Sequence, residues 1–236
     1  MKALISLLQF TTILPLGRQQ DLADFARHSY LYPCAGYIIG GLVALPVFFI
    51  ADRTIASAAA VALFLLISGA HHFDGLLDLG DGLMAHGDRE KRIRALTDRN
   101  VGAGGIAAGI AVTLLLFAGL MASPAIIYAI IIGDVCAKFS MAFLTAYGTP
   151  FREGIHSYLH QYSRPAFPFI AGLFCIPLVL LPVSPFRLVG AGVIMVACPL
   201  ILCIVSRRLF GGMNGDVVGA SNEITRACVI VALALI

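Results

Sequence analysis

Three aspartates, Asp74, Asp78 and Asp81, follow one another at intervals of four and three residues. On a helix these intervals place three carboxylates on one narrow stripe. Like charges in that arrangement destabilise a bare helix, and a cation between them removes the conflict. Carboxylate oxygens, together with phosphate oxygens from a substrate, suit Mg²⁺ or Mn²⁺. The spacing therefore predicts that all three aspartates bind Mg²⁺, with Mn²⁺ as a second candidate ion.

The alternative is a solvated acidic face on a surface helix. The residues between the aspartates are leucines and glycines, not the Lys and Glu of a wet helix, which favours the metal site. A basic stretch that contains Arg92 follows. Cations beside a carboxylate-held metal suit a polyphosphate substrate, although a basic stretch also fixes membrane orientation. No Ser or Cys nucleophile motif accompanies these residues, so the pattern favours phosphoryl transfer by direct in-line displacement.

Composition decides which elements position these residues. The chain has 236 residues, of which 59% are hydrophobic and 12% charged, whereas a soluble domain carries about 25% charged residues. The six cysteines lie singly in apolar runs, which argues against a disulfide scaffold. A net charge of +3, without a basic run interleaved with aromatics, argues against nucleic acid as a partner. The chain is predicted to be an integral membrane protein.

The apolar runs are long and unbroken, which favours membrane-spanning helices over a barrel. We expect an all-α bundle of six or seven spans, the seventh partial, in a single integral-membrane domain of residues 1–236. A short interfacial or re-entrant helix is expected within Met1–Leu16. The expected spans are Leu31–Ile50, Thr54–His72, Val101–Ala122, Ala125–Tyr147, Ala166–Val183, Leu188–Val205 and the shorter Ile224–Ile236.

The cations indicate the orientation of this bundle. Of 16 Lys and Arg residues, 12 fall on one side of the seven-span layout, two on the other and two inside spans. The positive-inside rule places the first side in the cytoplasm. The same side receives all the long connections: Gly17–Tyr30, Phe73–Asn100, Gly148–Pro165 and Ser206–Glu223. We therefore expect a catalytic segment at residues 73–100 that faces the cytoplasm.

Two charges lie inside the expected fourth span, Asp134 and Lys138, four residues apart. Ionisable residues within a membrane are energetically expensive and usually functional. They either neutralise each other, or Lys138 binds a substrate phosphate. A transporter with an ion pathway through Asp134, Lys138 and Asp216 is a further alternative. The lack of a visible internal repeat counts against it.

Two motifs make the chain resemble a known family. The run H-x-D-G-L-x-D-x-x-D-G-L, which begins at His72, is similar to the signature of the cobalamin synthase family. Residues 215–223 are similar to that family's late G-D-x-x-G-A-x-x-E element. The likeness extends through Gln9–Pro15, Tyr32-Pro33, Arg92 and Asp98. It departs after Asp98, where Arg-Asn stands in place of Ser-Arg, and at Asn214, where a Thr is usual.

The resemblance implies a Mg²⁺-dependent adenosylcobinamide-GDP ribazoletransferase of a prokaryotic cell membrane. Such an enzyme joins α-ribazole or its 5′-phosphate to adenosylcobinamide-GDP and releases GMP, a late step in assembling the nucleotide loop of cobalamin. Its other implied partner is the lipid bilayer, and a homo-oligomer is left open. The resemblance, together with the residue types and their spacing, gives Asp81 and Asp98 as catalytic residues. The expected substrate-binding residues are Arg92, Lys138, Asn214, Asp216 and Glu223.

Two points stay open. The resemblance selects His72, whereas helical spacing places His71 on the aspartate stripe, so neither is assigned a role. The run Asp78-x-x-Asp81-Gly82-x-x-Ala85 also matches the opening of the CDP-alcohol phosphotransferase pattern, with His86 in place of its Arg. That alternative implies closely related chemistry, in which an alcohol attacks a pyrophosphate and a nucleoside monophosphate leaves.

Overall fold

The structure is a computed structural model, and it describes residues 2–236. All the regular elements within these residues are helices. These residues form no β-strand, and Pro150 and Met213 make an isolated bridge. The all-α prediction is therefore confirmed. The elements are α1 (Lys2–Thr11), α2 (Leu22–Ala26), η1 (Ser29–Leu31), α3 (Tyr32–Phe48), α4 (Arg53–Ile67), α5 (His71–Met84), α6 (Arg89–Leu96), α7 (Ala103–Ala122), α8 (Ile126–Tyr147), α9 (Ile155–Tyr162), α10 (Phe167–Cys175), η2 (Ile176–Leu180), α11 (Pro185–Phe210) and α12 (Gly215–Leu235).

Five helical segments are long and apolar enough to cross a membrane: η1 with α3, and α7, α8, α11 and α12. Two further pairs pass the same test together but bend sharply. Helix α5 turns 93° from α4, and the segment of α10 and η2 turns 91° from α9. The count is therefore five to seven, which supports a multi-pass membrane protein.

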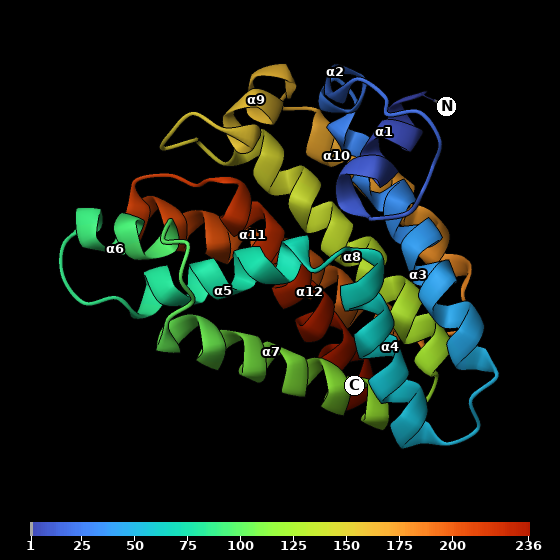
Figure 1. Ribbon diagram of the computed structural model, residues 1–236. Helices are drawn as coiled ribbons and strands as arrows, with labels where there is room; N and C mark the ends of the chain where they lie inside the picture. The colour runs from blue at the N-terminus through green and yellow to red at the C-terminus, as the bar shows by residue number, and fades with distance from the viewer. Residues whose placement is uncertain (1) are drawn as a thin grey trace.

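Helix α8 runs diagonally through the molecule and packs against α3, α10, α11 and α12 (Figure 1). Helix α12 also packs against α5 and α7. Both α8 and α12 are mostly buried, whereas α7 and α11 expose large apolar side chains such as Leu114, Val189 and Ile201. Large apolar patches on an outer surface are unusual for a soluble monomer and are typical of contact with lipid.

The expected second span, Thr54–His72, is not one straight helix. Helix α4 ends at Ile67, and Gly69 and Ala70 both take left-handed backbone conformations, with φ angles of 60° and 58°. Such angles stop a right-handed helix, and they are uncommon for Ala. Helix α5 then starts in a new direction. The acidic helix therefore turns away from the span, and much of the expected connection Phe73–Asn100 is helix.

The expected seventh span was wrong in its length. It is a full helix from Gly215 to Leu235, not the partial Ile224–Ile236. The preceding connection is correspondingly short, because α11 continues to Phe210 and only residues 211–214 separate it from α12, so Ser206–Glu223 is no long loop. Polar residues in the first half of α12 lower its hydropathy, but they are buried against neighbouring helices. Hydropathy counts residues singly and does not register such partners.

Other boundaries differ less. The expected span Ala166–Val183 consists of α10 and the short 3₁₀ helix η2, and the expected span Leu188–Val205 belongs to the longer α11. The N-terminal helix is present as α1. Its interfacial location stays a prediction.

Candidate active site

Carboxylates from two helices meet at one end of the bundle. Asp74 and Asp78 belong to α5, and Asp216 lies in the first turn of α12. The two helices approach so closely at Gly75 that a Cβ there would lie 2.6 Å from the carbonyl oxygen of Asp216. Because glycine has no Cβ, it permits this approach. We call Asp74, Asp78 and Asp216 the acidic group.

Around the acidic group, negative charges outnumber positive ones. Asp78 is acted on by the negative charges of Asp216, Asp74 and Asp81, and by the positive charge of Arg152. Arg152 Nη2 lies 3.7 Å from Asp216 Oδ2, and both side chains are partly exposed, so this pair is weak. The like-charge conflict expected from the sequence is therefore present, and it includes a fourth carboxylate.

The chemistry of these donors fits a hard divalent cation. No three His, Cys, Asp or Glu side chains within residues 2–236 are already arranged to hold a metal ion. However, the acidic group offers only oxygen atoms, is partly open to solvent and lacks a full set of counter-charges. Mg²⁺ binds through one or two carboxylates and keeps several waters, so it does not need a closed protein cage. Binding of Mg²⁺ or Mn²⁺ here stays a prediction.

Asp81 has a structural partner that the sequence analysis missed. Its Oδ2 accepts a hydrogen bond from Gly102 N–H at 2.7 Å, and its Oδ1 accepts one from Gly105 N–H at 2.8 Å. A carboxylate at a helix N-terminus satisfies unpaired N–H groups and interacts favourably with the helix dipole. The signal in the sequence was the glycine-rich start of α7. Each carboxylate oxygen has a second lone pair, so this cap leaves Asp81 able to bind a cation.

A second set of charged residues is buried between α8 and α12. Arg226 Nη2 donates to Asp134 Oδ1 at 2.8 Å, and Arg226 Nη1 donates to Glu223 Oε2 at 2.7 Å. Lys138 Nζ donates to Asn222 Oδ1 at 2.7 Å and lies 3.6 Å from Asp134 Oδ1. We call these five residues the buried network. Its two acids and two bases neutralise each other.

The buried network contains two of the expected substrate-binding residues, Lys138 and Glu223. Both are almost fully buried, and neither lines the cavity beside the acidic group. Their binding roles stay predictions. Arg226 and Asn222 were missed, although an Arg three residues after an acid in an apolar segment is a usable signal.

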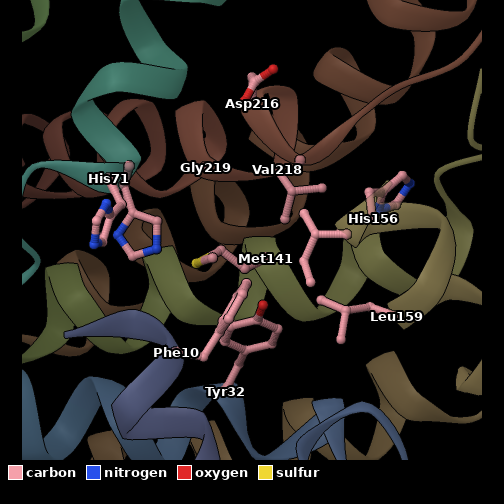
Figure 2. A pocket seen from close by; sticks show the side chains of 12 residues that line it. Phe10, Tyr32, His71, Met141, His156, Leu159, Asp216, Val218 and Gly219 are labelled. Carbon is pink, nitrogen blue, oxygen red and sulfur yellow. The ribbon is translucent and has the colours of Figure 1, made fainter. Parts of the chain in front are cut away.

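A cavity of about 320 Å³ lies beside the acidic group, and residues of α1, α3, α5, α8, α9 and α12 line it. Figure 2 shows Asp216 at one edge and Phe10 and Tyr32 at the opposite edge. A second hollow, of about 190 Å³, shares Asp216 and His156 with the cavity and adds Arg152. An apolar space thus opens toward the carboxylates and a cation.

The chain matches a family model described as cobalamin-5-phosphate synthase over residues 3–234. It belongs to this family. A protein of Halorubrum lacusprofundi named adenosylcobinamide-GDP ribazoletransferase is 34% identical over 97% of this chain and 95% of its own. Proteins of the same name are 36% identical in Methanocella arvoryzae, over 92% and 89% of the two chains, and 37% identical in Deinococcus radiodurans, over 92% and 80%. No solved structure gives a significant match.

Membership in the cobalamin-5-phosphate synthase family makes the chain a transferase, and it confirms the resemblance found in the sequence. The structure brings the family's two motifs together, since Asp74 and Asp78 come from the first and Asp216 from the second. Asn214 belongs to the same place: its side-chain oxygen accepts from Val217 N–H as the cap of α12, and its amide donates to Asp216.

Two of the residues expected in the site, Arg92 and Asp98, do not belong to the acidic group. Arg92 Nη1 donates to the Leu83 carbonyl at 2.9 Å, near the end of α5. A guanidinium has five N–H donors, so this bond does not use its capacity for phosphate. Asp98 lies exposed in the turn before α7, where hydrogen bonds from the Asn100 backbone and side chain lower its pKa. It is not among the charges that act on Asp78.

His71 and His72, between which the sequence did not decide, lie in different surroundings. His72 is buried, with its Nδ1 3.5 Å from the amide nitrogen of Asn222, whereas His71 is exposed. Both line the cavity, and Figure 2 labels His71.

Proposed function

We propose that this member of the cobalamin-5-phosphate synthase family transfers α-ribazole or its 5′-phosphate to adenosylcobinamide-GDP and releases GMP. The observation that carries the proposal is the meeting of Asp74 and Asp78 with Asp216 beside a cavity, because these residues come from the two motifs of the family. The full-length similarity to proteins named ribazoletransferase supports the choice of substrates.

In the proposed reaction, a ribazole hydroxyl attacks the phosphorus on the cobinamide side of the pyrophosphate. A new P–O bond forms, the P–O bond to GMP breaks, and GMP leaves with the electron pair. Mg²⁺ or Mn²⁺, when bound, would supply positive charge against the negative charge that develops on the phosphates. Asp74 and Asp78, with Asp81 at the N-terminus of α7, are the residues that would hold it.

The remaining groups bind and orient the substrates. Arg152, beside Asp216, and Arg92, at the end of α5, are the cations placed to bind phosphate oxygens. A carboxylate accepts the proton of the attacking hydroxyl, and Asp81 and Asp98 are the candidates. Asp98 is the weaker one, because its lowered pKa makes its carboxylate a poorer base and it lies in an exposed turn.

We infer that the site faces the cytoplasm of a prokaryotic cell. Twelve of the 14 cations outside the expected spans fall on the side of the acidic group, and orientation follows Lys and Arg. Both substrates are water-soluble, so a site at this end of the bundle receives them without a membrane crossing.

One assay tests the proposal. Membranes that contain the protein are incubated with adenosylcobinamide-GDP, α-ribazole 5′-phosphate and Mg²⁺. We expect GMP and the completed corrinoid in equal amounts, and neither product from the Asp78→Asn variant. GMP release that does not require ribazole phosphate, or no corrinoid product at all, would contradict the proposal.

The same assay addresses the alternatives. The aspartate spacing on α5 also fits a CDP-alcohol phosphotransferase, which would release CMP from a CDP-alcohol donor. A transporter would move substrate between compartments without releasing nucleotide. The internal pairing of the buried network disfavours the transporter, because its charges already have protein partners.

A further inference from the structure

The cavity beside the acidic group contains two buried polar atoms that have no protein partner within residues 2–236. They are Tyr32 Oη and His156 Nδ1. The Thr145 hydroxyl lies near Tyr32 Oη, but it donates its hydrogen to the Met141 carbonyl and completes no hydrogen bond with Tyr32. Tyr32 is fully buried and His156 is 3% exposed. A buried polar atom without a hydrogen bond destabilises the folded protein, because it has lost its bonds to water and gained none. Such atoms at the wall of a cavity indicate a ligand that supplies the missing bonds.

The hydrogen-bonding roles of these atoms follow from their surroundings. His156 Nε2 lies 2.8 Å from the Gly148 carbonyl oxygen. A carbonyl only accepts, so Nε2 carries the hydrogen and Nδ1 is an acceptor. The Tyr32 hydroxyl is directed toward the interior of the cavity (Figure 2) and supplies a donor. These two atoms therefore offer one donor and one acceptor. The other polar side chains that line the cavity are those of His71, His72 and Asp216.

The rest of the wall is largely apolar. Phe10, Met141, Leu159 and Val218 line it together with the ring of Tyr32 (Figure 2). Flat aromatic walls with few polar atoms suit a planar heterocycle that is mostly carbon. A ligand with polar edges would leave unpaired those edges that face this apolar part of the wall.

The substrates of the proposed function contain a corrin macrocycle and three bases, which are adenine, guanine and dimethylbenzimidazole. The corrin macrocycle is too large for a cavity of about 320 Å³. Guanine carries several donors and acceptors around its edge and no methyl group, so it matches the apolar wall of Phe10, Leu159 and Val218 less well. Adenine has an exocyclic amine and three unsubstituted ring nitrogens, so dimethylbenzimidazole matches the apolar wall best. Dimethylbenzimidazole, the base of ribazole, carries two methyl groups and a single unsubstituted ring nitrogen, which is an acceptor.

We propose that this cavity binds the dimethylbenzimidazole base of ribazole, with the Tyr32 hydroxyl donating to the unsubstituted ring nitrogen. The inference rests on the proposed function and adds the location of the acceptor substrate. The ribose then lies toward Asp216, where a ribose hydroxyl donates to His156 Nδ1. A 5′-phosphate extends into the second hollow, beside Arg152. This placement brings the attacking hydroxyl next to the acidic group.

The test measures binding of α-ribazole 5′-phosphate to the purified protein in lipid nanodiscs by calorimetry, without the cobinamide substrate. Tyr32→Phe removes only the hydroxyl, and we expect about three- to tenfold weaker binding, the range of one hydrogen bond. Leu159→Trp fills the cavity, and we expect a larger loss. Both variants should bind GMP as the wild type does. Leu173→Trp, at an outward position of α10 that is 63% exposed, is the matched control and should change neither affinity.

A ligand series adds a second readout that needs no variant. Removing both methyl groups from the base should weaken binding to the wild type about tenfold or more, because each buried methyl contributes about 0.8 kcal/mol. The same change should matter much less for Leu159→Trp, since its cavity no longer accepts the methyl groups. Where Leu159→Trp does not fold, Tyr32→Phe and the ligand series still decide the question.

The outcomes separate this inference from the proposed function. Unchanged ribazole affinity in Tyr32→Phe and Leu159→Trp, in a protein that forms corrinoid product, overturns the inference alone. Weaker GMP binding in the cavity variants also overturns it, since the cavity would then hold guanine. Absence of corrinoid product from the wild type overturns the proposed function.

Discussion

Helix α12 contributes carboxylates to two very different places. Glu223 belongs to the buried network, where two acids and two bases pair at distances of 2.7–3.6 Å. Asp216 belongs to the acidic group, where it meets Asp74 and Asp78 and only the half-exposed Arg152 lies opposite. Charges within a membrane bundle are tolerated where they neutralise each other. The excess negative charge at the open end therefore supports our proposal that this is where a cation or substrate binds.

The two places also differ in what they hold together. The buried network joins α8 to α12, and through Asn222 it reaches His72 on α5. Losing one member leaves an unpaired charge in the interior. In contrast, removing one charge from the acidic group should stabilise the protein, because the three carboxylates repel one another. Substitutions in the two places should therefore have opposite effects on stability.

Asp78→Asn is expected to have the largest effect on activity, a loss of at least about a thousandfold in kcat. A metal-binding carboxylate contributes several kcal/mol to the transition state, and each 1.36 kcal/mol is a factor of ten. Thermal stability should stay equal or rise, because one like charge is removed. GMP release and thermal unfolding in nanodiscs measure the two effects, with Asp24→Asn on α2 as the control. Near-normal turnover at saturating Mg²⁺ would remove Asp78 from the site.

Arg226→Met should have the largest effect on stability. It leaves Glu223 buried without its cation and Asp134 with Lys138 alone, which costs about 3–5 kcal/mol. The expected result is a strongly lowered unfolding temperature and poor recovery from membranes. Arg208→Met, at the exposed end of α11, is the matched control. If Arg226→Met unfolds like the control, the network does not hold α8 to α12.

Asp81→Asn should lower both activity and stability, because Asp81 caps α7 and is also an expected metal ligand. An amide oxygen replaces only one of the two hydrogen-bond acceptors, so we expect a loss of about 1 kcal/mol in stability together with lower activity. Unfolding temperature and kcat, measured on one preparation, separate the two. A change in stability with full activity would leave Asp81 as a cap only.

Asp98→Asn should have the smallest effect, a change in kcat of less than about tenfold. The hydrogen bonds from Asn100 lower the pKa of Asp98, so the carboxylate is already ionised at neutral pH. Stabilisation of this turn is present above the usual carboxyl pKa and is lost only as the pH falls through the lowered value. The pH profile near neutrality should therefore be unchanged. A loss of 100-fold or more, the scale of general-base catalysis, would make Asp98 the base.

The sequence predicted the features that depend on local spacing. Period and hydropathy indicated the helical class and the number of spans, and the spacing of Asp74, Asp78 and Asp81 correctly placed them on one helix. The break after Ile67 was not predictable from hydropathy, because it depends on two backbone angles. The start of α12 was missed because its polar residues find partners on other helices. The cavity was missed because Phe10, Tyr32 and His156, which line it, are far apart in the chain and only the fold brings them together.

Binding of Mn²⁺ to the purified protein, measured by electron paramagnetic resonance, tests the central claim most directly. We expect saturable binding in nanodiscs that Mg²⁺ displaces, that weakens strongly in Asp74→Asn and Asp78→Asn, and that is unchanged in Asp24→Asn. Release of GMP should respond to the same variants in the same order. Absence of saturable Mn²⁺ binding with both substrates present, or binding that Asp78→Asn leaves unchanged, would contradict a metal-dependent transfer at the acidic group.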